Sequence, residues 1–126
     1  MFNYTFRPSV KEKLALFSEF GFEFIHWCDD WNNTVYYTQE MMREYRQLTE
    51  AANIKCLDVH GTSTSDVRID AEDRGLYKLY VKLLENRIIF CSEMGGDAVV
   101  VHPPGDKTGT ELKKSLILSL IHISEP

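Results

Sequence analysis

The chain has 126 residues, enough for one domain and too few for two. Hydrophobic residues make up 44% and charged residues 26%, which is typical of a globular protein and excludes a disordered or fibrous one. The net charge of −5 argues against nucleic acid as the main partner, because phosphate binding needs a concentrated Lys/Arg surface. A small polar ligand fits this composition better.

Cysteine usage and the lack of targeting signals predict a cytoplasmic protein. Cys28, Cys56 and Cys91 are widely spaced and form no CxxC pair, so we expect reduced thiols rather than disulfides or a zinc ribbon. The N-terminal residues MFNYTFRPSVKEK contain no uninterrupted apolar core and no small-residue cleavage site. No stretch reaches membrane-spanning length, so we expect no membrane partner.

The first elements are predicted to be a helix followed by a strand. Ser9 and Glu12 have the spacing of a capping box, and apolar residues then recur at helical period until Gly21. Residues 22–27 (FEFIHW) are aromatic and β-branched, as in a short strand, and the polar loop 28–34 follows.

The same order repeats in the next segment. Thr38 is suited to cap a second helix, and Asn53 is suited to the left-handed residue that ends it. Residues 54–60 (IKCLDVH) are the next expected strand, followed by a polar loop over 61–70.

A third helix is expected from near Ala71 to Gly95. Its predicted apolar face consists of Leu76, Tyr80, Leu83, Arg87, Ile88 and Cys91. Residues 97–102 (DAVVVH) are Val-rich, a pattern typical of a parallel strand buried on both faces. A fourth helix is expected to begin within residues 111–116, and residues 1–6 (MFNYTF) have the alternation of an earlier strand.

Alternating helices and strands predict an α/β fold with right-handed crossovers between parallel strands. Histidines 26, 60 and 102 end the three expected strands at roughly the interval of one β/α repeat. Both a (β/α)8 barrel and an open doubly wound sheet have this pattern, and periodicity does not choose between them.

In both architectures ligands bind where the carboxyl ends of the parallel strands meet. The polar and aromatic residues expected there are His26, Trp27, Asp29, Asp30, Trp31, His60, Thr62, Ser63 and His102. Three histidines at equivalent positions favour one shared site over three separate core residues. The tryptophans have two alternatives, an apolar wall against a sugar ring or packing beneath the loop.

Asp58 is expected on the same strand face as His60, opposite Leu57 and Val59, because side chains alternate along a strand. A carboxylate at this position needs a partner. It is expected either to orient His60 or to pair with a basic residue outside this chain.

Three segments carry a resemblance to a known family. GFEFIHWCDDW (21–31), LDVHGTS (57–63) and GGDAVVVHPPG (95–105) resemble the second, third and fourth strand ends of the sugar phosphate isomerase/epimerase superfamily. This is the xylose isomerase-like TIM barrel, which also includes the endonuclease IV type of apurinic-site nuclease. The resemblance covers about residues 8–110. It implies a partial (β/α)8 TIM barrel of about the first four β/α units, with parallel strands and outer helices, over residues 1–117.

The resemblance also implies a function for the complete barrel. Family members bind a divalent metal ion (Mn, Mg, Co or Zn) through residues of strands five to eight and move a proton between adjacent carbons of a ketose or related polyol. The matching residues here are His60 and His102 on the substrate side, and the other expected substrate-binding residues are His26, Trp27 and Asp30. No catalytic residue or metal ligand is expected in this chain, so we expect it to be inactive alone.

Two alternatives remain open. In an endonuclease IV-like phosphodiesterase, His60 and His102 would be zinc ligands, although the acidic or neutral loops CDDWNN and GTSTSD argue against DNA binding. The other alternative is a non-catalytic barrel fragment. A half-barrel leaves strand edges and an inner face uncovered, so we also expect self-association into a homo-oligomer.

The last nine residues are set apart from the rest. Residues 118–126 (LSLIHISEP) resemble the translation of a transposase adapter used in DNA library preparation. We therefore expect a tail that is not native and exclude it from the functional analysis.

Overall fold

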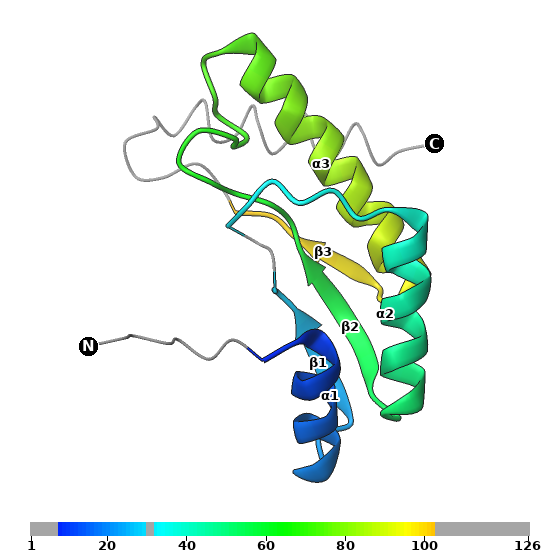
Figure 1. Ribbon diagram of the computed structural model, residues 1–126. Coiled ribbons are helices and arrows are strands. Elements are labelled where there is room, and N and C mark those ends of the chain that lie inside the picture. The colour runs from blue at the N-terminus through cyan, green and yellow to red at the C-terminus, as the bar shows by residue number, and fades with distance from the viewer. Residues whose placement is uncertain (1–7, 30–31, 103–126) are drawn as a thin grey trace, which may run out of the picture.

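The computed structural model describes residues 8–29 and 32–102. These residues form three helices and three strands in strict alternation (Figure 1): α1 (Val10–Glu19), β1 (Phe24–Trp27), α2 (Gln39–Ala51), β2 (Lys55–His60), α3 (Arg74–Glu93) and β3 (Ala98–Val100). The predicted α/β order is confirmed. The expected helix within residues 111–116, the early strand at 1–6 and the tail at 118–126 lie outside the described residues.

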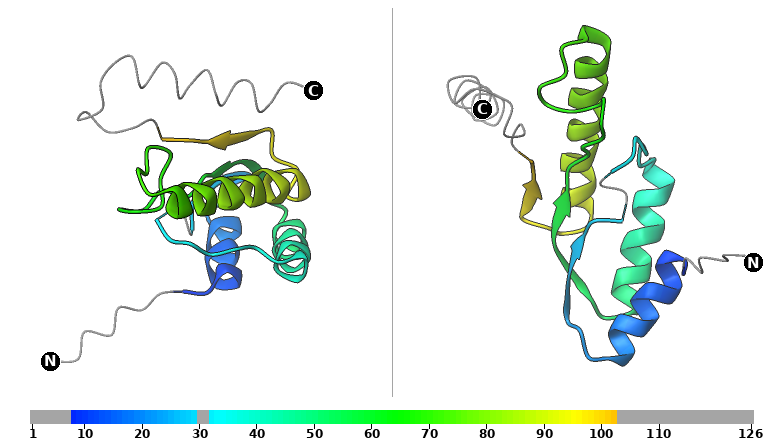
Figure 2. Two further views of the ribbon diagram at one scale, coloured as in Figure 1. Left: turned by 90° about the horizontal axis from the view of Figure 1, so that it is seen from above. Right: turned by 90° about the vertical axis from the view of Figure 1, so that its left-hand side faces the viewer.

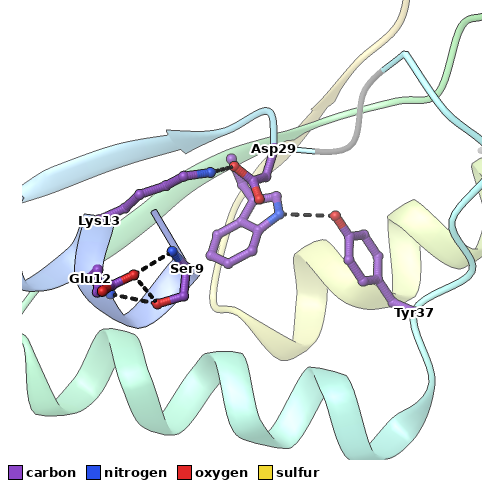
Figure 3. Close-up of polar contacts among 6 residues, drawn as sticks. Ser9, Glu12, Lys13, Asp29 and Tyr37 are labelled. Atoms are coloured by element: carbon purple, nitrogen blue, oxygen red, sulfur yellow. Dashed lines mark hydrogen bonds and ion pairs between the residues drawn. The ribbon is translucent and has the colours of Figure 1, made fainter. Parts of the chain in front are cut away.

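The helix ends follow the predicted local signals. Ser9 and Glu12 form a complete capping box at the start of α1 (Figure 3), and Thr38 accepts the backbone N–H of Met41 at the start of α2. Gly21 and Asn53 follow the two helices with φ of 78° and 55°, in the left-handed region that ends many helices.

The third helix differs from its prediction in its start and in its buried face. It begins at Arg74 rather than near Ala71, because Asp73 is the N-cap and accepts the backbone N–H of Leu76 at 2.9 Å. Ile88 was predicted to be buried but is 49% exposed, whereas Phe90 and Asn86 are buried. The buried stripe is therefore wider and slightly rotated from the one predicted.

The three strands form one parallel sheet in the order β1-β2-β3. Two views at right angles show all three helices on the same side of this sheet (Figure 2). Across the described residues, each new strand is therefore added on the same side of the preceding one, and each connecting helix lies on the same face of the sheet. Such an arrangement is compatible with part of a β/α barrel.

A register shift interrupts the pairing of β1 with β2. Ile25 pairs with Cys56 and His26 pairs with Asp58, so Leu57 has no partner in β1. The buried residues Cys56 and Val59 are consequently three positions apart. Leu57 is 40% exposed, so of the two residues expected opposite Asp58 only Val59 is buried.

The core lies between the sheet and the helices. One cluster is centred on Trp27, Tyr37, Val59 and Phe90, and a second packs Val67 and Ile69 of the β2–α3 loop against α3. The expectation that β3 is buried on both faces is wrong for the described chain, because the helices cover only one face and Val100 remains 36% exposed. None of the helices within residues 8–29 and 32–102 is long and apolar enough to cross a membrane.

Candidate functional site

The candidate site lies on the sheet face that points away from the helices, which we call the open face. Ile25, Trp27, Val59 and Val99 point toward the helices, so their strand neighbours occupy the opposite face. The open face carries Phe24, His26, Asp58, His60, Ala98 and Val100. Two of the three predicted strand-end histidines therefore lie on one face, and the third follows β3.

His60 and His102 are in direct contact. The Nε2 atoms of the two rings are 2.7 Å apart, and the ring centroids are separated by 4.8 Å. His60 ends β2, and His102 lies two residues beyond the end of β3, so the parallel pairing of His60 with Val100 delivers both rings to one edge. The predicted convergence of these histidines is confirmed in its geometry.

The contact requires one imidazole to donate an N–H and the other to accept it. Burial lowers the pKa of His60 below the ordinary value of 6.5, the positive form of His102 lowers it further, and Asp58 acts in the opposite direction. His60 is therefore neutral at neutral pH. Within the contact, one of the two Nε2 atoms is therefore a hydrogen-bond donor and the other is an acceptor.

Asp58 has a partner that the sequence did not indicate. Its Oδ2 lies 2.7 Å from Nδ1 of His26, on the neighbouring strand. The register shift brings these two residues opposite each other. This contact adds a partner to the two that were expected for the Asp58 carboxylate.

Trp27 lies on the other face of the sheet. It is only 6% exposed, its Nε1 donates to the Tyr37 hydroxyl at 3.1 Å (Figure 3), and its ring packs edge-on against Phe90. Tyr37 in turn stacks on Phe90 with ring centroids 4.1 Å apart. Trp27 is thus a core residue in the described chain, which corrects its assignment to the substrate side.

Two contacts hold the loop after β1 in place. Lys13 of α1 forms an ion pair with Asp29 (Figure 3), and the Thr62 hydroxyl donates to the backbone carbonyl of Asn33. Asp30, the remaining predicted substrate-binding residue, and Trp31 lie outside the described residues.

A small cavity of about 140 Å³ lies between α1 and β1. Its walls are mostly apolar, and the paired residues Lys13 and Asp29 also line it. Its lining includes His26 but neither His60 nor His102, so it is separate from the contact between those two rings.

Two residues that shape the site were missed by sequence reasoning. Asn86, fully buried on α3, binds the backbone of Tyr37 and so anchors the loop after β1. Gly61 allows β3 to approach, since a Cβ at this position would lie 2.9 Å from the carbonyl oxygen of Val100. Two features of the sequence could have indicated these roles: Asn86 interrupts the apolar stripe of a helix, and Gly61 directly follows a strand-end histidine.

The buried thiols are poorly suited to chemistry. Burial is the main cause that raises the pKa of Cys56 to about 11, and burial also raises the pKa of Cys91. Both thiols therefore remain protonated at neutral pH and donate to backbone carbonyls.

Within residues 8–29 and 32–102, no three His, Cys, Asp or Glu side chains are arranged to hold a metal ion. The described part of the chain therefore does not fit the divalent metal that the resemblance implies.

Comparison of the chain with protein-family models, with curated proteins and with solved structures finds no match. The functional assignment thus depends on the site itself and on the sequence resemblance.

Proposed function

We propose that this chain is the N-terminal half of a xylose isomerase-like barrel whose complete form is a sugar (phosphate) isomerase or epimerase. The observation that carries the proposal is the contact between His60 and His102, with Nε2 atoms 2.7 Å apart at the carboxyl edge of a parallel sheet. This is the edge at which β/α barrels bind their substrates.

The hydrogen-bonding character of the pair suits a sugar hydroxyl. A hydroxyl both donates and accepts, so it fits between a ring nitrogen that accepts and one that donates. Insertion would exchange one hydrogen bond for two and would require the Nε2 atoms to separate by roughly 2 Å, given N···O distances of about 2.9 Å. His102 follows β3 rather than lying within it, so its position is not fixed by strand pairing.

The winding of the chain supports a barrel. Doubly wound sheets place helices on both faces and reverse their strand order at the ligand site. Here the order β1-β2-β3 does not reverse, and α1, α2 and α3 lie on one side (Figure 2). The exposed apolar side chains Phe24 and Val100 on the open face are those that the rest of a barrel would cover.

In this proposal, proton transfer and metal binding are carried out by residues beyond those described. His60 and His102 hold substrate oxygens, and His26 lies on the strand beside them. No step is assigned to a metal through this chain, since its described residues do not form a metal site. A cytoplasmic location remains part of the proposal.

The test is an assay of the protein encoded by the uninterrupted gene. Ketoses and their phosphates should be interconverted in the presence of added divalent metal, and His60→Ala and His102→Ala should each reduce turnover strongly. Cleavage of DNA at apurinic sites without sugar turnover would instead support the nuclease. Sugar binding without turnover would contradict an enzyme.

A further inference from the structure

The contact between Asp58 and His26 determines more than the position of two side chains. An ionised carboxylate has only acceptors, so the His26 nitrogen that faces it, Nδ1, carries the proton. In the neutral ring the other nitrogen, Nε2, then holds a lone pair and no proton. The pair therefore fixes the tautomer of His26.

The two side chains of this contact differ in how far they are buried. The Asp58 side chain is 18% exposed, whereas that of His26 is 70% exposed, so the carboxylate lies deeper and the imidazole extends toward solvent. A partly buried carboxylate depends on its donor, and the register shift at Leu57 is what brings His26 opposite Asp58. Asp58 also belongs to β2, the strand that carries His60.

We infer that Asp58 is a positioning residue that holds His26 with Nε2 as an acceptor on the open face, so that this point of the site selects a ligand hydroxyl. A sulfate ion, a fully deprotonated phosphate monoester or a carbonyl oxygen offers only acceptors and makes no hydrogen bond to this nitrogen. The choice of a hydroxyl rests on the proposed function, in which the ligand is a polyol.

The tautomer can be read on the full 126-residue chain without substrate. In long-range proton–nitrogen NMR spectra of ¹⁵N-histidine protein, recorded where the ring is neutral, His26 should be in the Nδ1–H form. Asp58→Ala should shift it to the Nε2–H form that free imidazole side chains prefer in water. Asp97→Ala, which removes an exposed carboxylate just before β3, is the matched control and should change nothing at His26.

Two outcomes would overturn the inference: an Nε2–H tautomer in the native chain, or an unchanged tautomer in a folded Asp58→Ala variant. Circular dichroism and the His60 resonances report whether that variant folds. If it does not fold, Asp58→Leu provides the same removal of an acceptor with a filled volume, and the native-chain tautomer is decisive in either case.

The selectivity has its own readout. D-fructose at millimolar concentration should shift the His26 Nε2 resonance, and sulfate, which has no proton to donate at neutral pH, should not. A shift with sulfate alone would overturn the selection of a hydroxyl. Failure of the complete protein to isomerise sugars would leave the tautomer result intact, so the two proposals fail separately.

Discussion

The Asn86 carboxamide on α3 makes two hydrogen bonds to the backbone of one residue, Tyr37. Its Oδ1 accepts the Tyr37 N–H at 2.8 Å, and its Nδ2 donates to the Tyr37 carbonyl at 2.8 Å. Both residues are almost completely buried, and Tyr37 lies 49 positions away in sequence. A single side chain therefore fixes the loop after β1 against the third helix.

Asn86→Ala should destabilise the chain substantially. The change leaves a buried N–H and a buried carbonyl without their partner, which costs about 2–4 kcal/mol in the free energy of unfolding. Urea denaturation followed by circular dichroism measures the loss. Asn32→Ala, at an exposed position of the same loop, is the control and should stay within about 0.5 kcal/mol of the parent.

Gly61→Ala should separate the two contacting histidines. The added Cβ would lie 2.9 Å from the Val100 carbonyl oxygen, a backbone atom that is paired with Gly61 N–H and cannot turn aside. We expect β3 to move away from β2 and the His60–His102 contact to be lost. A crystal structure of the variant with an unchanged Nε2–Nε2 distance would show that this approach is not required.

Removing the His102 imidazole should raise the pKa of His60, because the positive form of His102 then no longer lowers it, while burial still lowers it and Asp58 still raises it. An NMR titration of His102→Ala against the parent measures the change. A depressed folded-state pKa means that the unfolded chain binds more protons below pH 6.5. The His60 contribution to stability is thus complete above that pH and decreases as the pH falls toward the folded pKa.

His102→Ala should change stability little, because His102 is exposed at the edge of the sheet. Val99→Ala should cost about 1–2 kcal/mol, since Val99 packs against both core clusters, and Val101→Ala should also cost more than His102→Ala. Thermal melts of the three variants give the comparison. Equal losses of melting temperature in His102→Ala and Val101→Ala would place His102 in the packing rather than in the site.

The open face should drive self-association. Phe24 and Val100 are exposed beside unpaired edges of β1 and β3 in the described sheet, so residues 1–117 should elute as an oligomer or aggregate. Phe24→Ser should weaken this association, whereas Phe20→Ser, at the end of α1, should not.

Size-exclusion chromatography with light scattering separates these outcomes. A stable, cooperatively folding monomer of residues 1–117 would mean that the chain is a small complete α/β domain rather than half of a barrel.

Local signals in the sequence predict the order of the elements and most of their ends. Capping residues such as Ser9 and Thr38, and left-handed positions such as Gly21 and Asn53, act through hydrogen bonds and φ angles within a few residues. The placement of histidines at successive strand ends was also readable, because parallel strands bring equivalent ends to one edge.

The contacts between side chains of different elements, by contrast, depend on the tertiary structure. The register shift at Leu57 sets His26 opposite Asp58, and no local pattern encodes the pairing of two strands. Trp27 is in the core rather than at the site because Tyr37 and Phe90, from distant segments, form its pocket. Long-range packing of this kind depends on all elements at once, whereas caps and turns depend on their immediate neighbours.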